Sequence, residues 1–264
     1  MYSINSILIA GVLFVSMVLA IEMGYRLGLR TQASASDAFK THVNTIGASI
    51  LGILALLLGF TFSLSLQRFD SRSQAVVEET NAIGTTYLRS QLLPASLRSN
   101  VQLLLREYLD LRVQASAITL DDQQEREMLL AEASRTQIAL WGYAQQAAEE
   151  EPNPVTTGLF IQSLNELIDN FGKRNAALNR HVPEVILFLL YGTLLMGATV
   201  VGYASGVAGF RVSVPAYIMV VLIVVLVYVI IDLDRPRRGM IQVDQRSLIE
   251  LQGAVNSDAN ATPP

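Results

Sequence analysis

The sequence predicts an all-α integral membrane protein with four transmembrane helices and a cytoplasmic helical bundle inserted between the second and third. Three observations support this fold class. The chain of 264 residues is 51% hydrophobic and only 16% charged, whereas soluble proteins average about 25% charged residues. Four apolar runs are each long enough to cross a bilayer, which takes about 20 helical residues. Between the second and third runs, apolar residues recur at helical spacings of three and four.

The four runs contain no Asp, Glu, Lys, Arg or His, as expected of segments that lie in lipid. The first has no basic segment before it and no clear small-residue cleavage site after it, so we expect a retained helix rather than a signal peptide. The runs are Ile4–Ile21, Ile46–Leu66, Val185–Ala208 and Val212–Ile231.

Lys and Arg residues near the ends of the runs are unevenly distributed. Nine lie on the side that holds residues 67–183 and the C-terminus, against four on the other side. This excess predicts that both termini and the middle region are cytoplasmic. The expected domains are 1–66 with the first two membrane helices, 67–183 with the bundle, 184–232 with the last two membrane helices, and 233–264 as a cytoplasmic, partly disordered C-terminal segment.

Breaks in the bundle region are marked by proline. Pro94 separates two of its helices, and the stretch EEEPNP at 149–154 ends another, with Pro154 able to start the next. No proline lies between Ile46 and Leu93. The second membrane helix is therefore expected to continue unbroken well beyond the bilayer. The tail from Gly253 is small and polar, which predicts disorder.

Composition excludes several classes of protein. The chain has no Cys, so disulfides, thiolate metal sites and Cys nucleophiles are ruled out, and its two His residues lie far apart in sequence. A net charge of −4 gives no reason to expect nucleic acid as a partner. There is no glycine-rich phosphate loop, metal-ligand motif or nucleophile elbow. We therefore expect neither an enzyme nor a bound cofactor.

Small residues form one stripe along the second membrane run. Small stripes let helices approach closely in lipid, so the first interpretation is packing within the chain. The alternative is an oligomer axis, where these residues would line a pore. A similar stripe of Ala198, Gly202, Ser205 and Gly209 occurs on the third run. The second-run stripe consists of Ala48, Gly52, Ala55, Gly59 and Ser63.

The absence of charge inside the membrane disfavours a coupled transporter, which usually needs buried ionisable groups at that depth. A passive pore of apolar, small and hydroxyl side chains remains compatible, because such pores gate by dewetting.

A polar face follows the second run along the same predicted helix, opposite a packing face. It is interpreted either as a solvated face or as the inner mouth of an ion path. The packing face consists of Val76, Thr80, Ile83 and Tyr87, and the polar face of Glu78, Asn81, Thr85 and Arg89.

A dense charge cluster follows the fourth run. One interpretation leaves its carboxylates in water and its arginines at anionic lipid headgroups, and a second pairs carboxylates with arginines, including Arg68 or Arg72. A third, ranked below these, is a divalent-cation clasp made by Asp232, Asp234 and Asp244. The cluster comprises Asp232, Asp234, Arg235, Arg237 and Arg238, followed by Gly239.

Two blocks of the chain resemble the bestrophin-like family of uncharacterised bacterial membrane proteins. They are LGFTFSLSLQRFDSRSQAVVEETNAIGTTYLRSQLLP at 58–94 and DLDRPRRGMIQVDQRSL at 232–248. Bestrophins are pentameric anion channels with cytosolic termini, a neck lined by the second helix, and an acidic calcium clasp after the fourth. The resemblance implies that the small stripe occupies the neck position and that the three aspartates lie near the clasp. The chain departs from bestrophins in lacking an aromatic ring at regular turns of the neck and a run of consecutive acids.

These observations predict a passive channel-like protein of the bacterial inner membrane, conducting anions as a homo-oligomer in the lipid bilayer. The alternative is a membrane-anchored interaction or scaffold module whose bundle docks a cytoplasmic protein partner.

Overall fold

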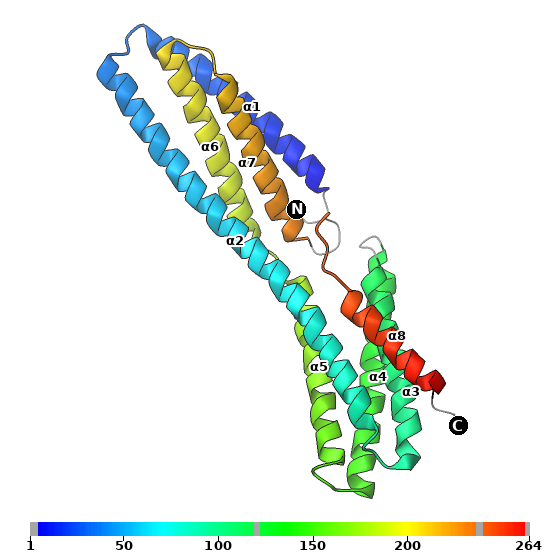
Figure 1. The fold of residues 1–264 in the computed structure, drawn as a ribbon. Helices are drawn as coiled ribbons and strands as arrows, with labels where there is room; N and C mark the ends of the chain where they lie inside the picture. Colours follow the sequence, from blue (N-terminus) through cyan, green and yellow to red (C-terminus); the bar gives the residue numbers. More distant parts are fainter. Residues whose placement is uncertain (1–4, 119–121, 236–239, 262–264) are drawn as a thin grey trace. The chain divides into compact units, whose positions relative to one another are not determined.

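The computed structural model describes residues 5–118, 122–235 and 240–261, and every regular element in these ranges is an α-helix (Figure 1). The helices are α1 Ser6–Gln32, α2 Asp37–Ser90, α3 Ala95–Ala117, α4 Gln123–Glu150, α5 Thr157–Asn179, α6 Glu184–Ala208, α7 Val214–Leu233 and α8 Arg246–Ala261.

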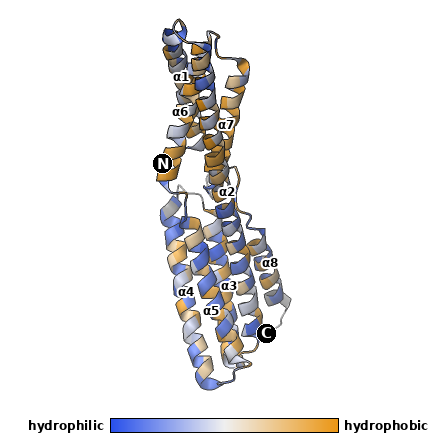
Figure 2. Ribbon diagram, turned by 90° about the vertical axis from the view of Figure 1, so that its left-hand side faces the viewer, coloured by the Kyte–Doolittle hydropathy of each residue, from blue (hydrophilic) through white to orange (hydrophobic). Residues whose placement is uncertain are grey.

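Four segments are long and apolar enough to cross a membrane, in agreement with the four predicted runs. They are α1, α2, α7 and the stretch Thr157–Ala208, whose apolar part is α6. Figure 2 shows the contrast in hydropathy between α7, which is hydrophobic along most of its length, and α4, where hydrophilic and hydrophobic residues alternate.

The structure divides into two compact units. Unit 1 contains α1, α2 as far as Phe69, α6 and α7, whereas unit 2 contains α2 from Asp70, together with α3, α4, α5 and α8. The second membrane helix is unbroken over 54 residues, as predicted. At 1.5 Å per residue it is about 80 Å long, far more than the roughly 30 Å of a bilayer core requires.

The core of unit 1 combines side chains from all four of its helices. Leu13 and Ile21 come from α1, Leu54 from α2, Leu194 from α6 and Ile230 from α7, and each is buried. A core of this kind fixes which face of each helix points inward, so the remaining faces are open to lipid or to another chain.

Glycines bring α1 and α6 into backbone contact. A Cβ added at Gly24 would collide with the carbonyl oxygen of Thr199, and one added at Gly202 would collide with that of Ile21. Gly28 and Gly206 are equally close to the opposite backbone. Small residues on facing helices allow this approach in lipid. Ala198 and Gly202 of the third-run stripe are buried and serve packing inside the chain, whereas Gly209 of the same stripe is exposed at the end of α6.

Helices of unit 2 bury the apolar stripes that the sequence predicts. Val101 and Tyr108 on α3, Leu140 on α4, and Phe160 and Leu164 on α5 are all completely buried. Neighbouring pairs are α3 with α4, α4 with α5, and α3 with α8. The helices of unit 2 thus pack as a bundle around buried apolar side chains.

Two local predictions differ from the structure. α5 begins at Thr157 rather than at Pro154. The tail from Gly253 was expected to be disordered, but α8 extends to Ala261. Leu248 and Val255 of α8 are buried, and this apolar contact with the bundle outweighs the low helix propensity of the polar tail.

Replacement of Gly202 by Ala should destabilise the protein by about 1–3 kcal/mol, because the added methyl group collides with the α1 backbone. Thermal unfolding in detergent measures the change. Gly192→Ala is the matched control, since Gly192 lies on the same helix with open space at its Cβ position. An equal effect of both changes would contradict the packing argument.

Candidate functional site

The small stripe of α2 lies on the surface of the chain. Ala48, Gly52, Ala55, Gly59 and Ser63 are all exposed. A Cβ added at Gly52 or Gly59 would meet no other atom within 4 Å. Among the described residues the stripe therefore packs against nothing, and the interpretation as packing within one chain is wrong. Its role as the lining of a pore stays a prediction.

The polar face that follows on α2 is partly tied to neighbouring groups. Asn81 is exposed, whereas Glu78, Thr85 and Arg89 are half-buried. The Glu78 carboxylate accepts a hydrogen bond of 2.8 Å from the amide of Gln74. Arg89 donates to the carbonyl of Leu159 at 3.0 Å. Arg89 thus helps to join α2 to α5, which leaves Glu78, Asn81 and Thr85 as the open part of this face.

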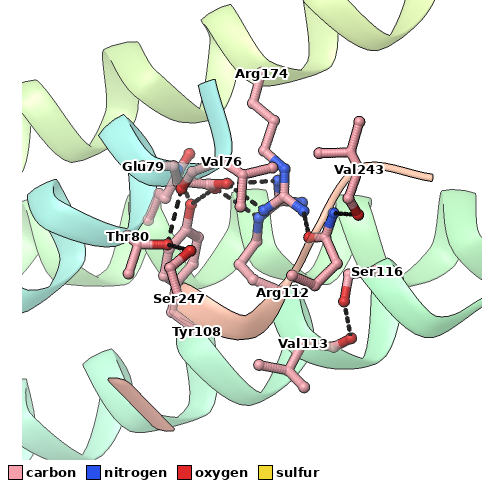
Figure 3. Close-up of polar contacts among 12 residues, drawn as sticks. Val76, Glu79, Thr80, Tyr108, Arg112, Val113, Ser116, Arg174, Val243 and Ser247 are labelled. Atoms are coloured by element: carbon pink, nitrogen blue, oxygen red, sulfur yellow. Dashed lines mark hydrogen bonds and ion pairs between the residues drawn. The ribbon is translucent and has the colours of Figure 1, made fainter. Parts of the chain in front are cut away.

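The opposite face of α2 holds a buried carboxylate that the sequence analysis did not single out (Figure 3). Glu79 is completely buried. Arg112 of α3 donates to both of its oxygens, at 2.6 and 3.0 Å, and Arg174 of α5 donates at 2.6 Å. The hydroxyl of Tyr108 donates to Glu79 at 3.0 Å and accepts from Gln137 of α4 at 3.2 Å. The carboxylate therefore joins α2 to α3 and α5, and the Tyr108 hydroxyl extends the network to α4.

The same network reaches the segment before α8. Arg174 donates to the side-chain oxygen of Gln245 at 2.7 Å, and the Gln245 amide donates to the carbonyl of Val243 at 3.0 Å. The guanidinium of Arg112 also lies over the ring of Phe171, 4.8 Å from its centroid. A cation above an aromatic face is stabilised by the ring electrons.

The network lies beyond the apolar run of α2. Its geometry determines which of its side chains are charged. Burial by itself raises the pKa of Glu79, but the charges of Arg112 and Arg174 outweigh it and hold that pKa below its ordinary value. Burial and the negative charge of Glu79 raise the pKa of Tyr108 well above its ordinary value. At neutral pH Glu79 is thus ionised and Tyr108 is a neutral hydrogen-bond donor.

A signal for this network was present in the sequence. Glu79 lies on the packing face between Val76 and Ile83, and Arg112 follows Tyr108 by four residues on the apolar stripe of α3. Charged residues on a packing face are rarely buried alone. The pattern could have predicted a buried ion pair, although not which partners meet.

A second buried arginine joins α2 to α5. Arg72 is 1% exposed, and its guanidinium donates to the carbonyls of Ala177 and Arg180 at 3.2 and 2.6 Å. These carbonyls belong to the C-terminal end of α5, where a cation complements the helix dipole. Arg72 thus fixes the end of α5 against α2.

The aspartates that follow α7 do not lie in water. Asp232 and Asp234 are 1% and 3% exposed. Asp232 accepts a hydrogen bond of 2.9 Å from the backbone N–H of Ile241. Both oxygens of Asp234 accept from the N–H of Val182, at 3.1 and 3.0 Å. The interpretation that places these carboxylates in solvent is therefore wrong.

Asp234 is an acidic residue at the C-terminus of a helix, and its position explains why it is tolerated there. Its carboxylate is unfavourable at the end of α7, but Val182 lies just before the first residue of α6, Glu184. A negative charge near a helix N-terminus is stabilised by roughly 0.3–1 kcal/mol. Asp234 therefore connects the antiparallel ends of two membrane helices.

The remaining residues of the charge cluster have separate positions. Arg235 is buried and donates to the hydroxyl of Ser6 at 3.1 Å, so it does not face lipid headgroups. Arg237, Arg238 and Gly239 lie outside the described residues. Asp244 is exposed and pairs with Arg246 at 2.7 Å. Within the described ranges, no three His, Asp or Glu residues lie close enough together to hold a metal ion, and the cation clasp gains no support.

Comparison with known proteins shows the family. The sequence model of the Bestrophin-like domain matches residues 12–248, so the chain belongs to the Bestrophin-like family. It is a membrane protein with transmembrane helices, and the resemblance carried by the two sequence blocks is confirmed.

Solved structures with the same fold include a bacterial Bestrophin homolog from Klebsiella pneumoniae. One structure of it has a TM-score of 0.62 and 18% identity, and covers 94% of this chain and 99% of that chain. A point mutant of that homolog has a TM-score of 0.64 and 17% identity, and covers 95% and 99%. No curated protein matches the chain.

Replacement of Glu79 by Gln should lower the free energy of unfolding by about 3–5 kcal/mol, because it leaves two buried guanidiniums without a counter-charge. Thermal or denaturant unfolding in detergent measures the loss. The control is Glu78→Gln on the half-buried side of the same helix, with an expected change within about 0.5 kcal/mol.

The same pair of variants tests the charge of Glu79 through pH. The pKa of Glu79 is lower in the folded state than in the unfolded state, so its ionised form stabilises the fold. This contribution is fully present above the unfolded-state pKa of 4.5 and is lost as pH falls through the folded-state pKa. Stability should therefore decline less steeply in acid for Glu79→Gln than for the unmodified protein. Equal slopes would show that Glu79 is not ionised in the folded state.

Proposed function

We propose that the protein is a passive, channel-like membrane protein that works as a homo-oligomer, with an ion path along the small stripe of α2. The observation that carries the proposal is the exposure of this stripe. An uncharged membrane-helix face with open space at Gly52 and Gly59 leaves room for a path once copies of the helix surround an axis. Membership of the Bestrophin-like family and the shared fold support the same conclusion.

The helical register of α2 continues the path beyond the apolar run. Gln67, Asp70, Gln74 and Glu78 follow Ser63 at successive steps of four, three, four and four residues, and all lie on the accessible surface. Side chains with this spacing share one face of a helix. A permeating ion would thus pass from small side chains in the membrane to hydrogen-bonding side chains at the inner mouth.

Passive conduction suits the chemistry of this face better than coupled transport. The four membrane runs contain no Asp, Glu, Lys, Arg or His, and a coupled mechanism usually requires such a residue at mid-membrane. Small and apolar linings conduct when wetted and close when dewetted. In this proposal the termini and unit 2 are on the cytoplasmic side of the bacterial inner membrane, where the excess of Lys and Arg is expected.

The mass of the purified protein in detergent should correspond to a closed ring of identical subunits, because one chain offers the stripe no partner. Light scattering corrected for bound detergent measures it. A monomer would contradict the channel proposal, and it would favour the alternative in which unit 2 docks a cytoplasmic protein while the helices anchor it.

Substitution of Gly52 or Gly59 by Leu should reduce ion flux into proteoliposomes to near the protein-free level, because the new side chain projects into the path. The matched control is Gly11→Leu on α1, which is also exposed with open space at its Cβ position. Assembly of each variant is checked by light scattering. Normal flux through correctly assembled Gly52→Leu and Gly59→Leu would place the path elsewhere or exclude it.

A further inference from the structure

A shallow groove of about 370 Å³ lies on the exposed face of α1, within unit 1. We call it the α1 groove. Its apolar lining consists of Leu19, Met23 and Leu27, and its charged lining of Glu22, Arg26 and Arg30. All six residues belong to one helix, so the groove forms in a single chain without a second subunit.

Packing against α6 holds this face of α1 outward. On the opposite side of the helix, Gly24 and Gly28 are in contact with the backbone of α6. The hydroxyl of Thr31 donates to that of Tyr203 on α6 at 3.2 Å. Rotation of α1 would separate these two backbones and break the hydrogen bond. The α1 groove therefore faces away from the core of unit 1.

The lining of the groove changes from apolar to cationic along the helix axis. Its apolar part continues an exposed apolar face of α1 that consists of Leu8, Val12, Val15, Leu19 and Met23. From Leu8 to Met23 this face is about 22 Å long at 1.5 Å per residue. Arg26 and Arg30 follow within two further turns. Because a hydrocarbon core is roughly 30 Å thick, the two arginines lie where the core meets the headgroups.

Cations outnumber carboxylates in the groove. Arg26 pairs with Glu22 at 2.7 Å, whereas no acidic residue of the described chain pairs with Arg30. One negative and two positive charges sum to +1. Asp37 at the start of α2, the nearest other carboxylate along the chain, is paired with Lys40 at 3.3 Å. The uncompensated charge of Arg30 therefore favours an anionic ligand.

We propose that the α1 groove binds a phospholipid with an anionic headgroup. Its phosphate contacts Arg26 and Arg30, and one acyl chain lies along Leu19 and Met23. Arginine near a membrane surface attracts anionic lipid, and its aliphatic stem lets the guanidinium reach the headgroups. A second copy of the chain on this face would bury the unpaired charge of Arg30, which is costly. The site is separate from the proposed ion path on α2.

Lipid titration of the purified full chain tests the proposal. Native mass spectrometry from detergent gives the apparent affinity for phosphatidylglycerol, which is anionic, and for phosphatidylcholine, which has no net charge. The unmodified protein should bind phosphatidylglycerol more tightly. Replacement of Arg30 by Gln should lower the affinity for phosphatidylglycerol roughly fivefold and leave that for phosphatidylcholine unchanged, because only the anionic headgroup gains from this charge.

The apolar part of the groove is tested with a matched pair of leucines. Leu19 in the groove is 63% exposed, and Leu222 on α7, outside the groove, is 64% exposed. Leu19→Ser should weaken binding of both lipids by about threefold, because the acyl chain loses its contacts there. Leu222→Ser should leave both affinities unchanged.

The charge control is Arg211→Gln, at an exposed position just after α6 that does not line the groove. It should leave the affinity for phosphatidylglycerol unchanged. An equal loss in Arg211→Gln and Arg30→Gln would overturn the proposal, because the effect would then reflect total charge. An unchanged affinity in Arg30→Gln would also overturn it.

Two other occupants of the groove are separate outcomes of the test. Glycerol 3-phosphate that binds as tightly as phosphatidylglycerol would show a site for soluble phosphate and overturn the lipid proposal. A change in oligomer mass for Arg30→Gln, measured by light scattering, would show that another subunit covers the groove and would also overturn it. None of these measurements depends on conduction, so failure of the channel proposal would leave the lipid site standing.

Discussion

The ionised carboxylate of Glu79 is the constraint on which unit 2 depends. A charge without access to water is tolerated only when its oxygens are fully hydrogen-bonded and its charge is balanced. Arg112, Arg174 and Tyr108 meet this requirement at 2.6–3.0 Å. Because these side chains come from α3 and α5, any sliding of either helix along α2 would leave a buried charge unpaired. The network therefore opposes any change in the register of these helices.

That register matters because α2 carries both the small stripe and the polar face of the proposed path. Its apolar part presents the small stripe, and its polar part presents Glu78 beside the cations of α5. The Glu79 network and the Arg72 contacts both join α2 to α5 on the packed side of the helix. The contacts on the packed side therefore hold α2 in place. The opposite side remains available to contact ions or other subunits.

Two similar small-residue stripes have opposite environments in unit 1. Gly202 and Gly206 of α6 face Gly24 and Gly28 of α1, so the two backbones touch. Gly52 and Gly59 of α2 face no described residue. Small residues let helix backbones approach closely in lipid, and Gly24 and Gly28 of α1 present them to α6. An exposed small stripe is then a surface available to another copy of the chain.

The sequence by itself determined the helical class, the four membrane segments, the unbroken α2 and the family, because apolar length and helical period are local properties. It also indicated the packing face that contains Val76 and Ile83. Only the tertiary structure decided which charges are buried. Glu79 is paired and Glu78 is half-exposed although they are adjacent in sequence, because a helix turns adjacent residues about 100° apart. In the same way, Asp234 accepts hydrogen bonds from the backbone of Val182. These two residues are distant in sequence, so no local sequence pattern predicts the contact.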